Sequence, residues 1–302
     1  MSFVLSVVSL LMQWYVWTPI VLILGYMTWR NYRSIDAVKN IESVLLMLEI
    51  PKTNDKSELA AEQMFASLHG ILRDARELKA NGGYQEHLSF EIASVGGRIQ
   101  FYVWTPKALQ SFVEGQIYAQ YPQVQIHTAE EDYVTHERHH TVVYTSELSL
   151  TDREFLPIKT FQSFEVDPLA GITGTLAKLE DTDEEIWIQM LVRPVRDDWH
   201  KAADSWITSI KTGGGQGGGG RWVASLIEAL WAPPEQGTGT AKELSERDKT
   251  RIAEAEKKAT KLGYQVKIRV AYLGESVSDA RLRMQGIVGT FKQFNSTNLN
   301  GF

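Results

Sequence analysis

The hydrophobic pattern of this chain starts with an unbroken apolar run near the first residue. Residues 3–29 contain no Asp, Glu, Lys or Arg. A helix rises about 1.5 Å per residue and the hydrocarbon core of a bilayer is roughly 30 Å thick, so about 20 apolar residues are enough to cross it. The pattern therefore predicts one transmembrane helix within residues 1–29. A re-entrant hairpin is the alternative, because Pro19 removes one helical hydrogen bond.

Charged and aromatic residues around this run predict its orientation. Arg30 and Arg33 follow the run directly, and the positive-inside rule places the side that carries them in the cytoplasm. Aromatic residues inside the run lie where an aromatic belt is not expected, so we expect them to contact another membrane helix. We therefore expect a single-pass protein of the cytoplasmic (inner) membrane with its soluble part in the cytoplasm. The expected anchor residues are Trp14, Trp17, Pro19, Arg30 and Arg33.

After this run, the apolar pattern predicts a first α+β subdomain. Apolar residues recur at steps of three and four over residues 35–48 and 59–72, which predicts amphipathic linker helices within residues 30–80. Apolar and polar residues then alternate on both sides of Gly96-Gly97, as in a β-hairpin. A helix before Pro122 and a strand after it complete a β-β-α-β order. We place this subdomain at residues 81–180.

A second α+β subdomain is predicted over residues 181–302. Residues 186–192 read as a strand buried on both faces, and residues 264–272 alternate strictly, as in a strand with one buried face. Ser245 and Ser276 each stand three residues before an Asp and are expected to cap helices. The predicted fold class is α+β, with one N-terminal transmembrane helix followed by two ferredoxin-like (split β-α-β) subdomains.

Composition narrows the function classes. The 302 residues are 43% hydrophobic and 23% charged, which is ordinary for a globular protein. The absence of cysteine excludes disulfides, thiolate chemistry and Cys-type zinc sites. The formal net charge is −6, whereas proteins that bind a phosphate backbone use clustered Lys and Arg to release counterions. We therefore expect no direct nucleic-acid binding.

Two motifs suggest chemistry, and each has a simpler interpretation. The glycine-rich residues 213–220 lack the Lys and Ser/Thr of a P-loop, so we interpret them as a linker between two helices. His136, His139 and His140 are candidate metal ligands, but their motif is H-E-x-H, one residue short of H-E-x-x-H, and it lies beside a predicted strand. The sequence also lacks G-x-S-x-G. We expect no catalytic residue, metal or cofactor.

Three stretches together resemble one protein family. They are ESVLLMLEIPKTNDKSELAAEQMFASLHGIL at residues 42–72, GGRIQFYVWTPKALQSFVEGQIYAQYPQVQI at 96–126, and GYQVKIRVAYLGESVSDARLRMQGIVGTFKQFNSTNLNGF at 263–302. They resemble the membrane-anchored amino-terminal region of bacterial type IV secretion and conjugal-transfer ATPases of the DNA-translocase kind. The resemblance implies a following motor domain with Walker A and B motifs, and hexamers near the membrane. This chain contains no such motif, so it is either a fragment or an anchor that works with a motor on another chain.

The leading hypothesis is a non-catalytic membrane-tethering and assembly module of a type IV secretion or conjugal DNA-transfer machine. Its expected partners are the bacterial membrane, a cytoplasmic ATPase motor and further copies of itself in a homo-oligomer. A membrane-anchored adaptor or scaffold for unrelated cytoplasmic partners is the second hypothesis. The third is an enzyme that acts on small molecules or lipids, which would require a deep pocket with convergent polar groups.

Overall fold

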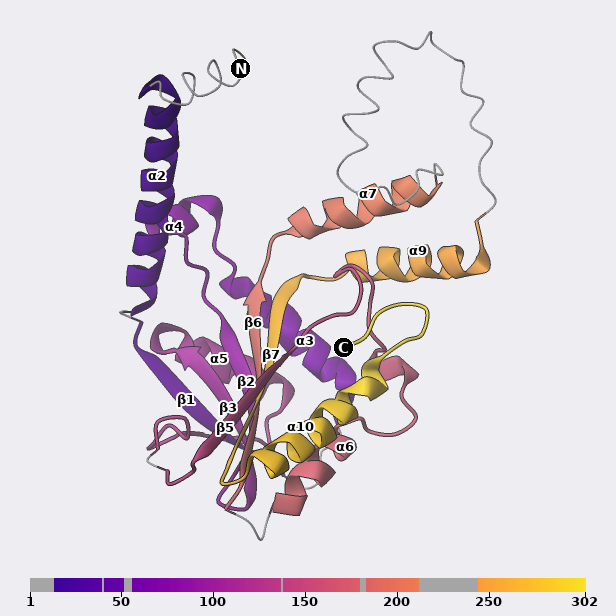
Figure 1. The fold of residues 1–302 in the computed structure, drawn as a ribbon. Coiled ribbons are helices and arrows are strands. Elements are labelled where there is room, and N and C mark those ends of the chain that lie inside the picture. Colours follow the sequence, from indigo (N-terminus) through magenta and orange to yellow (C-terminus); the bar gives the residue numbers. More distant parts are fainter. Residues whose placement is uncertain (1–13, 40, 52–55, 137, 180–182, 212–243) are drawn as a thin grey trace, which may run out of the picture.

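The computed structural model describes residues 14–39, 41–51, 56–136, 138–179, 183–211 and 244–302. The predicted glycine-rich linker at 213–220 lies outside these residues. Within them, seven antiparallel strands form one sheet in the order β4-β1-β3-β2-β6-β7-β5 (Figure 1). The strands are β1 (Ser43–Glu49), β2 (Leu88–Val95), β3 (Arg98–Pro106), β4 (Gln125–Thr128), β5 (Val142–Leu148), β6 (Glu185–Pro194) and β7 (Tyr264–Gly274). The fold class is α+β.

Helices connect the strands and cover one face of the sheet. They are α2 (Trp14–Lys39), α3 (Glu58–Leu68), α4 (Ala75–Ala80), α5 (Gln110–Gln120), α6 (Leu169–Leu176), α7 (His200–Lys211), α9 (Glu246–Ala259) and α10 (Val277–Phe291). Helices α3 and α5 bury an apolar cluster against β1, β2 and β3, and α6 and α10 bury another against β6 and β7. A third cluster lies between α7 and α9, beyond the ends of β6 and β7 (Figure 1).

The two halves of the chain have related strand orders. The first half runs β1-α3-β2-β3-α5-β4 with the spatial order β4-β1-β3-β2, which is a split β-α-β arrangement. The second half runs β5-α6-β6, then α7 and α9, then β7-α10, with the spatial order β5-β7-β6. Strand β5 thus takes the place of β1, β6 that of β2, and β7 that of β3.

The sequence predicted two separate ferredoxin-like subdomains behind a membrane helix. The structure corrects this prediction, because β2 pairs with β6. These strands pair antiparallel from Leu88↔Val192 to Ser94↔Ile186, so that both halves share one sheet. The physical reason is that β6 is apolar on both faces and sits between β2 and β7, where both of its edges are paired.

The predicted transmembrane helix is also wrong. In the part of the chain that the structure describes, no helix has the length and apolarity required to cross a bilayer. Helix α2 begins at Trp14 and carries charged residues from Arg30 onward. The single-pass topology and the inner-membrane location were inferred from this span and lose their basis with it.

One predicted linker helix is partly a strand. The helical spacing over residues 35–48 continues into β1, which pairs with β3 on one side and with β4 on the other. Leu45 and Leu46 are both buried, although they point to opposite faces of the sheet. A short apolar run of this kind is compatible with either a helix or a buried strand, and only the pairing partners decide between them.

Candidate functional site

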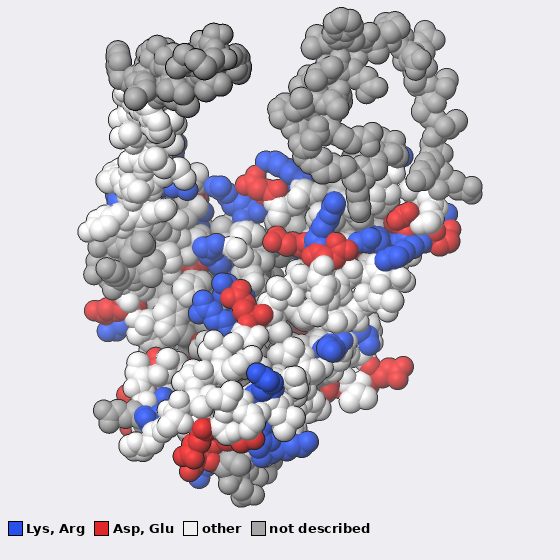
Figure 2. Space-filling model, viewed as in Figure 1, with Lys and Arg blue, Asp and Glu red and all other residues white. Residues whose placement is uncertain are grey.

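Helix α2 presents an exposed apolar surface. Every described side chain from residue 17 to residue 33 is exposed. We call the large apolar residues among them the α2 surface: Trp17, Ile20, Val21, Leu22, Ile23, Leu24, Tyr26, Met27, Trp29 and Tyr32. Each of them is between 40% and 70% exposed. Figure 2 shows the corresponding part of α2 in white, whereas charges of both signs are interspersed over the body.

The residues predicted to anchor the chain all lie on this helix. Trp14 is its first residue and Pro19 lies inside it. Trp17, Arg30 and Arg33 are exposed, and the Arg33 guanidinium lies 5.2 Å from the centre of the Trp29 ring. This contact is a cation–π interaction at the end of the apolar stretch.

The histidines weighed as metal ligands lie in the loop between β4 and β5 and do not converge. His136 Nδ1 is 3.0 Å from Glu131 Oε1, and His140 Nε2 is 3.6 Å from Glu185 Oε1. His139 is exposed. Among the described residues, which exclude Glu137, no group of three or more His, Asp or Glu side chains is placed to hold a metal ion.

Arg138, inside the same motif, fixes this loop to the open face of the sheet. Its Nε donates to both carboxylate oxygens of Glu185 at 3.0 Å, and both side chains are 9% exposed. The guanidinium also lies 4.9 Å from the centre of the Trp187 ring, and Trp187 Nε1 donates to Glu185 Oε2 at 2.9 Å. A buried charge pair is tolerated only when its hydrogen bonds are satisfied, which these contacts achieve. The loop is thereby held against β6.

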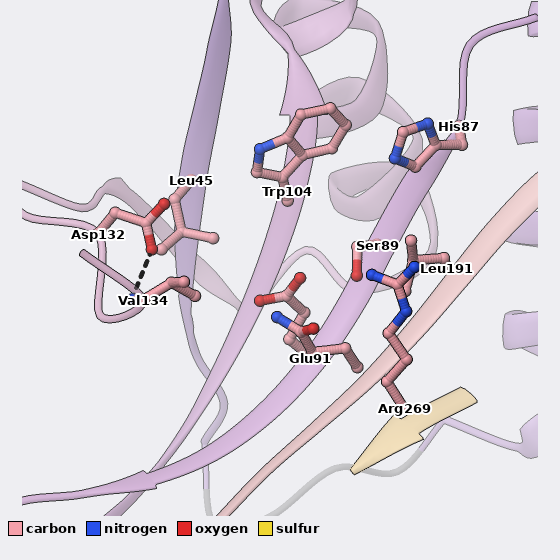
Figure 3. A pocket seen from close by; sticks show the side chains of 10 residues that line it. Leu45, His87, Ser89, Glu91, Trp104, Asp132, Val134, Leu191 and Arg269 are labelled. Carbon is pink, nitrogen blue, oxygen red and sulfur yellow. Dashed lines mark hydrogen bonds between the residues drawn. The ribbon is translucent and has the colours of Figure 1, made fainter. Parts of the chain in front are cut away.

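Beside this loop, the open face of the sheet contains a cleft of about 240 Å³ (Figure 3). Strands β1, β2, β3, β6 and β7 and the loop after β4 all contribute to it. Its apolar lining is Leu45, Trp104, Val134 and Leu191. Its polar lining is His87, Ser89, Glu91, Asp132, Gln189 and Arg269. Polar groups from distant parts of the sequence therefore converge on one hollow.

Glu91 is the most buried charged group of the cleft. Tyr133 Oη donates a hydrogen bond to Glu91 Oε2, and Gln189 Nε2 donates to Tyr133 Oη at 3.0 Å. Burial raises the pKa of Glu91 above its ordinary value, and the hydrogen bonds oppose this shift only in part. Burial, helped by the neighbouring Glu91, also raises the pKa of Tyr133. The Tyr133 hydroxyl therefore remains a donor and holds the carboxyl in place.

The other polar groups of the cleft keep free hydrogen-bonding capacity. The buried Ser89 Oγ lies beside the Glu91 carboxyl but makes no hydrogen bond of ordinary geometry. The Arg269 guanidinium likewise has no ion-pair partner among the described residues. In Figure 3, Arg269 lies on the side of the cleft opposite Asp132, with Glu91 between them. A ligand would therefore meet donors at one end and carboxylates toward the other.

His87 is not placed to activate Ser89. Its Nδ1 is 3.1 Å from Tyr84 Oη, and its ring stacks on Trp104 with ring centres 4.9 Å apart and planes 18° apart. Burial lowers the pKa of His87, and the positive charges of Arg193 and Arg269 lower it further. Nucleophilic catalysis requires a base within hydrogen-bond reach of the hydroxyl. In the described geometry, Ser89 Oγ has no such base within hydrogen-bond reach.

Comparison with protein families finds one family model that matches most of the chain. Residues 38–301 match the family described as Domain of unknown function (DUF8128). The chain belongs to this family. The DUF8128 match contains the whole sheet and the cleft, whereas α2 up to residue 37 precedes it. No curated protein matches the chain.

Sequence reasoning missed the cleft because its residues come from five strands and a loop. Glu91 and Tyr133 are separated by 42 positions, and Arg138 and Glu185 by 47. The sequence did contain one indication of the cleft: polar residues stand in the middle of otherwise apolar strands, such as Glu91 in β2 and Gln189 in β6. Buried polar residues of this kind are more informative than exposed ones.

Proposed function

We propose that this chain is a non-catalytic assembly module of a type IV secretion or conjugal DNA-transfer machine, and that it works with a cytoplasmic ATPase motor. The observation that carries the proposal is the α2 surface. Fully burying a large apolar side chain contributes about 1.5–3 kcal/mol, and contiguous exposed apolar patches mark interaction sites. A helix that is apolar around its circumference is expected to be buried among other helices.

The occupant that we assign to the α2 surface is the same helix in further copies of the chain. Identical helices that meet side by side bury identical apolar surfaces, which is the usual basis of a symmetric homo-oligomer. The sequence resemblance to the amino-terminal region of secretion ATPases supports the association with a motor.

Mass measurement with and without the cognate motor tests this proposal. We expect the purified chain to associate weakly alone and to join a closed oligomer when the motor is present. Leu22→Lys, at a position that is 67% exposed on α2, should shift the population toward smaller species. Leu282→Lys on α10, also 67% exposed, is the matched control and should have no effect. Monomers with and without the motor would contradict the proposal.

A second candidate function, small-molecule binding, rests on the cleft around Glu91. Convergent polar groups in an apolar hollow are typical of ligand sites. The unpaired Arg269 suits a carboxylate, and Glu91 suits an amino group. Free amino acids should therefore raise the melting temperature of the wild-type chain and leave that of Arg269→Gln unchanged. Equal responses of the two proteins, or no response of either, would remove this candidate.

A further inference from the structure

The two edge strands of the sheet differ in length and in how well they are protected from pairing with another strand. Strand β4 forms one edge and has four residues, whereas β5 forms the other and has seven. In the first half of the chain, β4 pairs along β1. Strand β5 is the counterpart of β1, and α10 is the counterpart of α5, the helix that leads to β4. Helix α10, however, leads into the short helical turn Lys292–Phe294, and the chain after that turn forms a backbone hydrogen bond with Thr151. Among the described residues, no strand takes the place beside β5 that β4 takes beside β1.

Strand β5 lacks the devices that usually prevent edge-to-edge pairing. Its sequence VVYTSEL has no Pro, Lys or Arg, and its register with β7 runs without a bulge from Val142↔Gly274 to Leu148↔Ile268. The Glu147 carboxylate lies 3.0 Å from Lys267 Nζ and is thereby neutralised from within the chain. Val143 is 64% exposed. An edge of this length with free backbone groups is a template for another strand.

We propose that β5 pairs antiparallel with β5 of a second copy of this chain, about a two-fold axis that passes through Thr145. Only this register pairs all seven residues of the strand with all seven of its mate. It places Val142 opposite Leu148 of the second copy and Thr145 opposite Thr145 of the second copy. Two strands related in this way present the same surface to each other, as a two-fold contact requires.

The side chains of β5 are complementary in this register. Val142 and Leu148 both pack on the apolar cluster under α6 and α10, so their cross-strand pair extends that cluster into the second copy. On the open face, Val143 meets Glu147 of the mate, and no two like charges stand opposite. Apolar and Thr–Thr pairs across strands are favourable, whereas opposed like charges are not. A register centred on Glu147 would oppose two carboxylates.

This contact goes beyond the proposed assembly through α2, because it uses a different element. It would exist in a protein whose α2 surface is disrupted. The two contacts are therefore separable by experiment.

Cysteine crosslinking in the full chain tests the proposal, because the natural sequence contains no cysteine. In the proposed dimer, the two Thr145 Cα atoms are about 4.5–5.5 Å apart, within the range that a disulfide bridges. The two Val143 Cα atoms are four positions out of register, roughly 13 Å apart, and beyond that range. Oxidised Thr145→Cys should therefore form covalent dimers, and Val143→Cys should remain uncrosslinked under the same conditions.

Sedimentation measurements give a second readout. In a Leu22→Lys background, Thr145→Lys should weaken dimerisation roughly fivefold or more by opposing two positive charges, and mixing it with Thr145→Glu should restore the dimer. Thr128→Lys, at an exposed position of β4, is the control and should dimerise like the parent. A monomeric parent, equal crosslinking at positions 143 and 145, or no rescue by the mixture would each overturn the proposal.

Discussion

At the scale of single residues, Glu91 and Arg138 show how the open face of the sheet accommodates charge. Glu91 is held by the Tyr133 hydroxyl, and Arg138 is paired with Glu185 beneath the same loop. Each charged group has a partner that comes from an element distant in sequence. The loop after β4 therefore depends on two polar contacts rather than on apolar packing alone.

The pKa of Glu91 predicts a change of stability with pH. Burial raises the pKa in the folded state above the ordinary 4.5, so the folded state binds this proton more tightly than the unfolded state does. The protonated Glu91 carboxyl therefore makes its full contribution to the free energy of unfolding below pH 4.5, and this contribution is lost as the pH rises through the pKa of the folded state. Each unit of pKa difference corresponds to about 1.4 kcal/mol.

Glu91→Gln keeps an acceptor for Tyr133 and removes the titration. We expect the free energy of unfolding of this variant, relative to wild type, to increase as the pH is raised from 4.5 to neutrality. Urea unfolding of both proteins at a series of pH values measures the difference. A difference that stays constant with pH would mean that the Glu91 carboxyl is not perturbed in the folded protein.

At the scale of elements, the β2–β3 hairpin is a case in which local sequence determined local structure. Gly96 and Gly97 have φ of 56° and 73° and connect the two strands in a two-residue turn, as their sequence predicted. Turns with two positive φ values match the twist of paired strands and require Gly, Asn or Asp. The capping roles of Ser245 and Ser276 are confirmed in the same way, since each side chain accepts a hydrogen bond from the backbone three residues on.

Substitution of Gly96 tests the turn. A Cβ atom at this position would meet no other atom within 4 Å, so the effect of a side chain is conformational. We expect Gly96→Val to lower the free energy of unfolding by about 1–2 kcal/mol, because a branched side chain disfavours positive φ. Gly96→Asn should be nearly neutral, because Asn tolerates this conformation. Thermal unfolding of both variants measures the effect. If Gly96→Val and Gly96→Asn lost the same free energy of unfolding, this account of the turn would be wrong.

Other elements could not be derived from their own sequence. Residues 44–48 are apolar without interruption, and only pairing with β3 and β4 makes them a strand. The contact of β2 with β6 joins positions nearly a hundred residues apart, and alternation specifies which face of a strand is buried but not which strand lies beside it. The cleft depends on the same pairing, because it brings Glu91 next to Gln189. Its residues were therefore beyond sequence reasoning.

At the scale of the whole molecule, the sequence has no P-loop Lys, and the proposed role is non-catalytic. We predict that the purified chain neither binds nor hydrolyses ATP, because a P-loop places a Lys on the β- and γ-phosphates. Shortening residues 213–220 should change the free energy of unfolding by only about 0.6 kcal/mol per halving of loop length. Nucleotide titration of the parent and of the shortened chain checks the first expectation, and urea unfolding of both proteins checks the second. Nucleotide affinity that disappears with these glycines would show that they are not a linker.

The position of β1 has a mechanical consequence. Helix α2 ends at Lys39 and the chain enters β1 at Ser43, a strand with a neighbour on each side. Tension applied through α2 would load the β1–β3 and β1–β4 ladders together. Tension at Phe302 would instead act on a segment that belongs to no strand and is held by the hydrogen bonds of Asn300, by Asn295 and by the packing of the Phe302 ring on Phe291 and Phe294. The module should therefore yield first at its C-terminal side and hold firm where α2 joins it.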